Sequence, residues 1–243
     1  TNSEWAYIKA GDPFDVAEME SERARISELF KDNGYYYYQK DFAAYFADTV
    51  SNPGKVNLKL QLADDLDEKA LKEWYIGDIN INFRKKLMES LDSTYKGRSF
   101  TAHYNGKRMP VRTRVVRNAL MFKKNELYSQ EKYTQSLKNI NSSGLYSGAS
   151  FTFTPRDTTA ECNILDVNLD LLFDKPYDFY VEAYGKGKTS GKLGPELIVG
   201  LTKRNAFRGR ELLDFNIHGS YEWQTGHDTE SSTTGVNSYE YGG

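Results

Sequence analysis

The chain has little cysteine and histidine, and each shortage excludes a kind of site. Its 243 residues include a single cysteine, Cys162, so no internal disulfide can form. The three histidines, His103, His218 and His227, show no metal-ligand spacing. A net charge of −2 leaves no basic surplus for nucleic acid, so we expect no nucleic-acid partner. No apolar run approaches the roughly 18 residues that a membrane-spanning helix needs.

Catalytic signatures are scarce as well. No Gly-rich phosphate loop or metal box is found, and no nucleophile, base and orienting group come together in the sequence. The carboxylate groups fall in turns or on a charged helix face: Asp64-Asp65, Asp67-Glu68 and Glu18-Glu20-Glu22. The sequence therefore predicts a protein that is not an enzyme and has neither cofactor nor metal.

Aromatic residues are abundant instead, with 18 Tyr and 13 Phe, which favours sheets, interfaces or membrane borders. Four tyrosines stand in a row at Tyr35 to Tyr38, after a charged stretch that reads as a helix. In a strand, Tyr35 and Tyr37 would share one face, and Tyr36 and Tyr38 the other. A sheet strand is the expected role, and a ligand-stacking cluster is the alternative.

A pattern of helix, strand and strand occurs twice. Residues 15–33 form an amphipathic helix ended by Gly34, and an alternating strand begins at Val56. Residues 129–144 form another helix ended by Gly144, and a similar strand begins at Val167. Both strands open with Val-Asn-Leu-X-Leu at matched distances from the glycines, which indicates an internal repeat.

The second copy is the more complete one. It opens with a strand over 73–81, followed by a hairpin-like insertion with a tight turn at 104–107 and a helix that starts at Pro110. The whole unit is strand, helix, helix, strand, strand. We expect that the first copy lacks its opening strand and most of its first helix because the chain is a fragment.

The helix after Pro110 is basic, and its central cations are Arg112, Arg114 and Arg117. Arg108, Lys123 and Lys124 flank them. A patch for anionic lipid or for an acidic partner is one interpretation. A solvated helix face is the other.

After Pro176 the helical patterns stop and the period becomes two. Residues 211–223 alternate an apolar face, with aromatics at its end, and a polar face; 179–188 and 195–203 do so more weakly. The connection at 204–210 is compact, whereas 224–237 is long and polar. Both features suit transmembrane β-strands, and an ordinary antiparallel sheet with one wet face would alternate in the same way.

These units in this order resemble the outer-membrane assembly proteins of the Bam and Tam type, which have periplasmic POTRA domains and a bacterial surface antigen β-barrel. The Gly34-Tyr35 junction, the helix entry at 127–129 and the turn residues carry the match in detail. The turn residues are Asn205, Phe207, Gly209 and Glu211. The tyrosine-rich composition of the chain resembles that of Bacteroidetes-type members of this family.

The resemblance implies an α+β chain with tandem βααββ domains and the first antiparallel strands of a barrel. The expected domains are 1–64, incomplete at its N-terminus; 73–174, with an insertion near 84–109; and 178–243, a truncated barrel. It places residues 1–174 in the periplasm and the turn at Asn205 to Glu211 on the periplasmic side of the outer membrane.

The resemblance also implies a function, the assembly and insertion of β-barrel proteins into the outer membrane. POTRA domains would bind unfolded clients by strand addition, with Tyr35 to Tyr38 as the sheet edge. Partners would be unfolded outer-membrane proteins, accessory subunits and outer-membrane lipid. A two-partner-secretion transporter and a soluble periplasmic or surface binding module are the alternatives.

Overall fold

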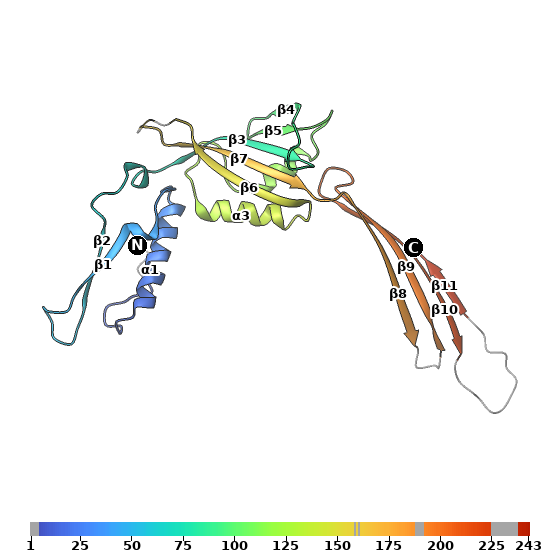
Figure 1. Cartoon of the computed structure of the whole chain (residues 1–243), viewed down its shortest axis with the longest axis horizontal. Coiled ribbons are helices and arrows are strands. Elements are labelled where there is room, and N and C mark those ends of the chain that lie inside the picture. Colours follow the sequence, from blue (N-terminus) through green and yellow to red (C-terminus); the bar gives the residue numbers. More distant parts are fainter. Residues whose placement is uncertain (1–4, 158, 160, 188–191, 225–237) are drawn as a thin grey trace, which may run out of the picture.

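The computed structural model describes residues 5–157, 159, 161–187, 192–224 and 238–243. Three sheets divide the chain into an N-terminal unit, a central unit and a C-terminal sheet (Figure 1). The expected mixture of helices and sheets is confirmed. The long polar connection predicted at 224–237 lies outside the described residues, except for Gln224.

The N-terminal unit consists of one long helix and a two-stranded antiparallel sheet. Its elements are α1 (Val16–Asp32), η2 (Lys40–Phe42), β1 (Ala43–Asp48) and β2 (Asn57–Leu62). Asp15 caps α1 by accepting a hydrogen bond from the Ala17 N–H. The chain leaves the helix at Gly34, whose φ of 96° lies in the left-handed region that glycine tolerates best.

The central unit is a five-stranded sheet in the order β4-β5-β3-β7-β6, with two helices. A 3-10 turn, η3 (Glu68–Ala70), leads into it. Its elements are β3 (Tyr75–Arg84), β4 (Ser93–Lys96), β5 (Thr101–Tyr104), α2 (Thr113–Ala119), α3 (Gln130–Asn141), β6 (Tyr146–Pro155) and β7 (Ile164–Phe173). Alternate residues of β3 and β7 are buried, and α2 and α3 add Val116 and Ile140 to the same core. Burial of this face is what holds the unit together.

The insertion forms a hairpin, but its turn lies elsewhere than expected. Gly97 N–H donates to the Phe100 carbonyl at 3.0 Å and closes the turn between β4 and β5, whereas the segment 104–107 starts at the last residue of β5 and continues beyond it. The hairpin pairs β5 in parallel with β3 and so covers that side of the sheet. Parallel pairing between distant segments has no local sequence signature, which is why the turn was misplaced.

Helix α2 begins at Thr113, three residues later than predicted. The Arg112 N–H donates to the Arg208 carbonyl at 2.8 Å, and Arg112 keeps an extended backbone. Val111 is buried in the core instead of starting a helical stripe. A contact with a segment almost a hundred residues away therefore sets the helix start.

The C-terminal sheet is antiparallel in the order β11-β10-β9-β8. Its strands are β8 (Tyr177–Gly187), β9 (Lys192–Arg204), β10 (Leu212–Gln224) and β11 (Ser238–Gly242). It extends from one side of the central unit, and the N-terminal unit extends from the other (Figure 1). In the part of the chain that the structure describes, no helix is long and apolar enough to cross a membrane.

Candidate functional site

The four tyrosines do not form a strand, so that prediction was wrong. The segment turns on itself: the Tyr36 N–H donates to the Gly34 carbonyl and the Tyr38 N–H to the Tyr35 carbonyl. Tyr38 is buried and stacks on Phe30 with ring centroids 4.5 Å apart. The rings therefore divide as Tyr35 and Tyr38 against Tyr36 and Tyr37, instead of alternating between two faces.

Tyr36 and Tyr37 pack against the central unit. The ring of Tyr36 lies edge-on to Tyr128 at 4.9 Å, and that of Tyr37 edge-on to Trp74 at 5.1 Å. Tyr35 and Tyr38 instead contact Phe30 on α1. The tyrosine run is thus the joint between the two units, with one pair of rings on each side.

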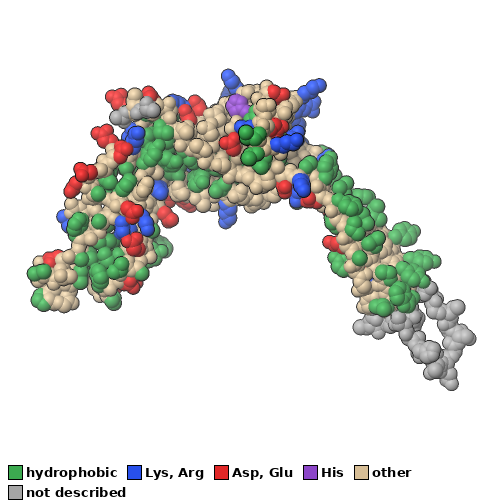
Figure 2. All heavy atoms as spheres, viewed as in Figure 1, with side chains coloured by type: hydrophobic (Ala, Val, Ile, Leu, Met, Phe, Trp, Pro, Cys, Tyr) green, Lys and Arg blue, Asp and Glu red, His purple; other side chains and the backbone are tan. Residues whose placement is uncertain are grey.

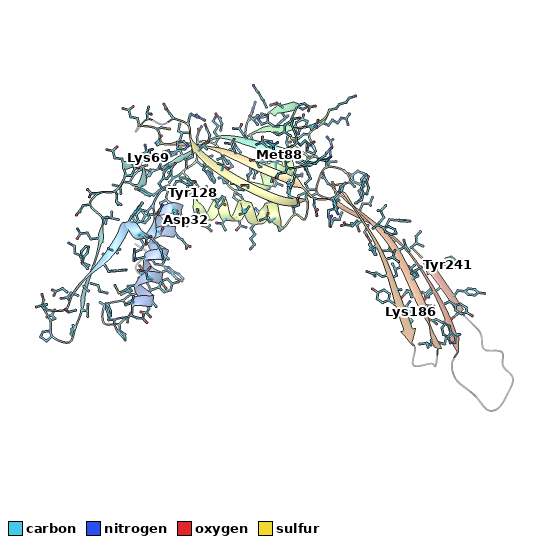
Figure 3. The ribbon with its side chains drawn as sticks, viewed as in Figure 1. Asp32, Lys69, Met88, Tyr128, Lys186 and Tyr241 are labelled. Carbon is cyan, nitrogen blue, oxygen red and sulfur yellow. The ribbon has the colours of Figure 1, made fainter. Side chains whose placement is uncertain are left out.

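Polar contacts reinforce this joint. The Asp32 carboxylate at the end of α1 accepts a hydrogen bond from the Glu131 N–H at 2.6 Å, at the start of α3. The Trp74 N–H donates to the Gly34 carbonyl at 2.8 Å. Figure 3 shows Asp32 and Tyr128 at this junction. Because the N-terminus of a helix favours a negative charge, Asp32 ties the N-terminal unit to α3.

Strand β6, which follows α3, lies at the edge of the central sheet. It pairs with β7 on one side, and no strand among the described residues pairs with its other side. The Arg156 N–H bonds the Ile164 carbonyl just beyond the strand end, so by alternation the backbone groups of Phe151 and Phe153 point outward. Pro155 also falls at an outward position, where its missing N–H costs no ladder bond.

This edge carries no charge. Its sequence is YSGASFTFTP, whereas natural sheets commonly blunt an exposed edge with lysine or other charged residues. The Ser150, Thr152 and Thr154 side chains are exposed on one face, and Phe151 and Phe153 are half-buried on the other. Ten residues of uncharged edge offer unpaired backbone groups to an incoming strand.

Aromatic rings line the helix side of this edge around Phe153. Its centroid lies 5.4 Å from Tyr128, 5.7 Å from Tyr133 and 5.6 Å from Tyr36. The joint between the units is therefore continuous with the free edge. Sequence reasoning assigned the edge to the tyrosine run, and the signal that would have found it is the absence of charge from 146–155.

The C-terminal sheet has one apolar face that spans its strands. Phe179, Leu201 and Phe215 stand side by side in the pairing register, as do Val181, Val199 and Ile217. Phe215 is 62% exposed. Hydrophobic side chains follow these strands in Figure 2. The predicted alternation is confirmed in the strand register.

Aromatic rings gather toward both ends of this face. Tyr221 lies 6.0 Å from Trp223 and 6.4 Å from Tyr239, while Tyr177 lies at the opposite end, under the Lys203 ammonium. The other face is polar, and Asp214 accepts hydrogen bonds there from the Tyr180 and Thr202 hydroxyls. Tyr241 and Lys186 mark the outer strands of the sheet in Figure 3.

The turn between β9 and β10 is built by its own side chains. The Glu211 carboxylate accepts hydrogen bonds from the Phe207 and Gly209 N–H groups, and Asn205 Oδ1 accepts one from the Arg210 N–H. Asn205, Arg208 and Arg210 all have positive φ. Such conformations cost energy in non-glycine residues and persist where the surroundings fix them.

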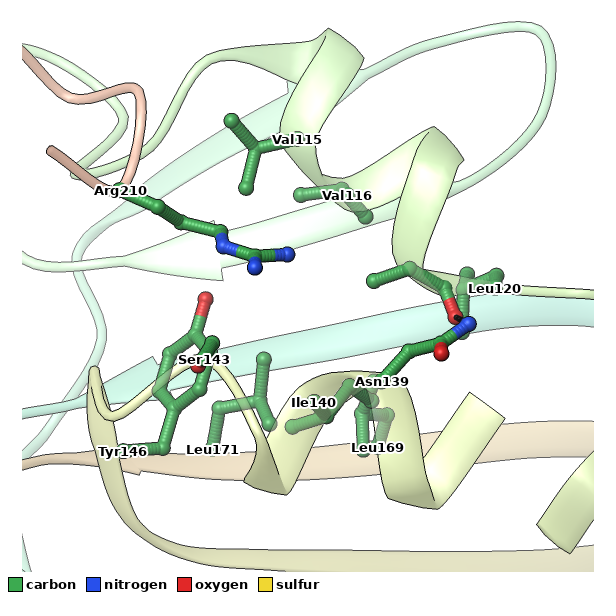
Figure 4. Close-up of a pocket in the computed structure, with 11 residues that line it drawn as sticks. Val115, Val116, Leu120, Asn139, Ile140, Ser143, Tyr146, Leu169, Leu171 and Arg210 are labelled. Atoms are coloured by element: carbon green, nitrogen blue, oxygen red, sulfur yellow. Dashed lines mark hydrogen bonds between the residues drawn. The ribbon is translucent and has the colours of Figure 1, made fainter. Parts of the chain in front are cut away.

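The same turn is docked on the central unit. Asn205 Nδ2 donates to the Pro110 carbonyl at 3.0 Å, and the Arg208 carbonyl accepts from the Arg112 N–H. Figure 4 shows Arg210 reaching over Tyr146, between α2 and α3. The space there is only about 20 Å³, enough for about one water molecule, so it is a packing seam and not a ligand pocket.

The turn gives a testable pH dependence. The N–H groups of Glu211 itself and of Gly209 hold the pKa of the Glu211 carboxyl below its usual value. The resulting stabilisation is therefore full above the unfolded-state pKa of about 4.3 and is lost as pH falls through the lower folded value. We expect Glu211→Gln to speed hydrogen exchange at the Phe207 and Gly209 amides by roughly five-fold at pH 7.

Exchange at these amides in the parent protein should also quicken in acid, relative to the intrinsic rate, and the variant should lose this pH dependence. Glu131→Gln on α3 is the matched control, because no hydrogen bond of the Glu131 side chain joins the turn. Unchanged protection in Glu211→Gln would show that the backbone holds the turn without the carboxylate.

The predicted basic residues end up in different surroundings. Arg112 lies at the start of α2 against the docked turn, while Arg114 and Arg117 are exposed on the helix. Lys124 pairs with Asp78 and Lys123 with Glu126, both away from α2. Within the described ranges, no group of three or more His, Cys, Asp or Glu side chains could hold a metal ion.

Comparison with known proteins gives structural likeness alone. No protein-family model matches the chain, and no curated protein matches it. The structure of BamA from Haemophilus ducreyi lacking POTRA domains 1–3 is similar at a TM-score of 0.58 and 13% identity, over 89% of this chain and 34% of that one.

Two further structures are similar at lower scores. CdiB from Acinetobacter baumannii matches 88% of this chain and 33% of its own, with 14% identity and a TM-score of 0.40. POTRA1-3 of Omp85 from Anabaena matches 68% and 54%, with 13% identity and a TM-score of 0.32. The chain thus spans about a third of the BamA structure, with which it shares its fold.

Proposed function

We propose that this chain is part of an outer-membrane assembly factor of the Bam and Tam type. In this proposal 1–64 and 73–174 are POTRA domains in the periplasm, and 178–243 begins a transmembrane β-barrel. The protein performs no covalent chemistry and helps unfolded β-barrel proteins to insert and fold. The observation that carries the proposal is the exposed apolar face of β8 to β11, in one chain with a free, uncharged strand edge.

The apolar face supports a membrane location. Soluble proteins rarely expose a continuous apolar patch this large, and lipid-facing strands of a barrel alternate apolar and polar residues with aromatics near both borders. Open sheet edges are not tolerated in lipid, so we propose that these four strands are part of a closed barrel. The likeness to BamA supports the same architecture.

The free edge supports client binding by strand addition. An extended segment pairing with β6 would bond the outward groups of Phe151 and Phe153, largely independently of client sequence. The edge strand at the other end of the sheet, β4, is only four residues long and ends in Lys96, so we expect pairing at the longer, uncharged β6. The client contact predicted for the tyrosines stays a prediction. Because Tyr36 lies beside Phe153, we expect its ring to contact a client strand that pairs with β6.

The further partners, the type of bacterium and the side of the membrane that the turn faces are proposed from the resemblance to the Bam and Tam type. Accessory subunits and outer-membrane lipid are the further partners that we propose. The tyrosine-rich composition supports a Bacteroidetes-type member. The turn at Asn205 to Glu211 then faces the periplasm, since it docks on the central unit.

Photo-crosslinking tests the proposed edge. A crosslinking amino acid at Thr152, exposed on β6, is expected to capture unfolded outer-membrane proteins in cells that produce the full-length protein. The matched control is Asn168, its register partner on β7, where capture should be several-fold lower because that strand is paired on both sides. A lysine at Thr152 should reduce capture at Ser150, since charge deters edge pairing.

The identity of the captured proteins decides between the candidate functions. Many different outer-membrane proteins would support an assembly factor, and one dedicated partner would indicate a secretion transporter instead. Equal capture at Thr152 and Asn168, or none at either, would refute strand addition at β6.

A further inference from the structure

Five of the twelve arginines in this protein form an ion pair with a carboxylate, and the other seven form none with any residue that the structure describes. Arg23, Arg25, Arg84, Arg156 and Arg204 each form an ion pair with a carboxylate. Five of those seven, called here the arginine cluster, are Arg108, Arg112, Arg114, Arg117 and Arg208. All five are exposed, and none forms an ion pair with any residue that the structure describes.

The arginine cluster gathers where the central unit meets the C-terminal sheet. Arg208 is in the docked turn, and its carbonyl holds the start of α2 through the Arg112 N–H. Arg114 and Arg117 follow within two turns of helix, less than about 10 Å along its axis. Arg108 precedes Pro110, whose carbonyl Asn205 binds.

This place is also the end of the apolar face. Phe207, at 62% exposure, is in the same turn as Arg208, and Leu212 and Leu213 follow it at the start of β10. Tyr177 marks the same border on β8, since it pairs with Lys203 and Lys203 pairs with Leu213. Exposed apolar side chains and exposed cations therefore lie next to each other at this end of the sheet.

The charge around the arginine cluster is predominantly positive. Residues 107–124 contain seven lysines and arginines and no carboxylate. The only acid in the turn, Glu211, uses its carboxylate on the turn's own N–H groups. Arg112 is near enough to the Glu211 carboxylate to help lower its pKa, but it forms no ion pair with it. Guanidinium groups present a planar fork of donors that matches phosphate oxygens, and in the described chain these five guanidinium groups form no hydrogen bond or ion pair.

We propose that the arginine cluster binds the phosphate headgroups of anionic phospholipids at the border of the bilayer that holds β8 to β11. This inference rests on the proposed function, because it requires the apolar face to lie in lipid. Cations next to an interfacial aromatic residue suit a headgroup layer. An acidic protein segment is the competing occupant, and the experiment distinguishes the two.

Fluorescence quenching in nanodiscs tests this proposal on the full-length protein, with Cys162→Ser to remove the native thiol. A fluorophore at Asn118→Cys, exposed beside Arg117, is read against lipids with a nitroxide on the headgroup, in phosphatidylcholine with increasing phosphatidylglycerol. We expect quenching to rise with phosphatidylglycerol and to weaken with salt. Arg114→Gln or Arg117→Gln should raise the phosphatidylglycerol fraction for half-maximal quenching by about five-fold.

Two controls separate the possible failures. Arg98→Gln removes an exposed arginine from the β4–β5 turn and should leave quenching unchanged. A second label at Phe215→Cys, read against acyl-chain nitroxides, reports whether the sheet lies in lipid at all. Quenching at Phe215 without any phosphatidylglycerol dependence at Asn118 would overturn this inference alone and leave an acidic protein as the occupant, whereas no quenching at Phe215 would overturn the proposed function.

Discussion

Replacing Ile217 with arginine is expected to prevent the C-terminal sheet from assembling in a bilayer. Ile217 lies in the middle of the apolar face, beside Val199 on β9 and midway between Leu213 and Tyr221, which lie near the two ends of that face. If this face meets lipid, a guanidinium there must be desolvated or must distort the bilayer. The cost is about 2–4 kcal/mol near the midplane, enough to change the folded population by more than ten-fold.

The measurement is the folded fraction recovered in phospholipid vesicles, read by resistance to protease and by heat-modifiable migration on gels. Asn216→Arg is the matched control: it adds the same charge one residue away, on the polar face, and should cost little. Equal loss in both variants would show a general defect of β10. Full recovery of Ile217→Arg would mean that the apolar face is not in lipid, and the membrane proposal would fail.

Alternation made the strands of this sheet predictable from sequence. A strand with one face in an apolar medium and one in a polar medium must repeat every two residues, and 211–223 shows that period clearly. Consecutive strands joined by short connections pair antiparallel, so the pairing of β9 with β8 and with β10 then follows. The Glu211 turn was also found from its residues, although its docking on Pro110 and Arg112 was not.

The tyrosine run shows where local propensity misleads. Four β-prone residues favour a strand on any local scale. Here the left-handed backbone at Gly34 starts a turn, and burial against Phe30 on one side and Trp74 on the other outweighs strand propensity. Neither neighbour is visible in the local pattern, because Trp74 belongs to the next unit.

The free edge was missed for a related reason. Which strand ends a sheet depends on the order of strands: β7 lies between β3 and β6, which leaves β6 at the edge, while the insertion pairs on the outer side of β3. The uncharged sequence of β6 carried a usable signal, but only once its position was known. Long-range pairing therefore decides the site, while the local pattern decides the elements.

Removing the Tyr36 ring is expected to loosen the joint between the N-terminal and central units. Tyr36 makes edge-on or tilted contacts with Tyr128 and Phe153, and each aromatic pair contributes about 0.5–1.5 kcal/mol beyond the area that it buries. With the lost apolar burial, Tyr36→Ala should weaken the interface by about 2–3 kcal/mol. The hydrogen bonds at Gly34 and Asp32 would remain.

Distances between spin labels at Glu28→Cys on α1 and Lys138→Cys on α3, in a Cys162→Ser background, measure this loosening directly. Tyr36→Ala should broaden the distance distribution, because the units then move relative to each other. Tyr35→Ala is the matched control: it removes the same ring from a half-buried site whose aromatic contact, among the described residues, is with Phe30 on α1. If strand addition at β6 needs the Tyr36 ring beside Phe153, client capture at Thr152 should decrease in the same variant whose distance distribution broadens. A distribution as narrow in Tyr36→Ala as in the parent protein would mean that Tyr37 and the polar contacts fix the units, and the Tyr36 ring would then have no part in presenting the edge.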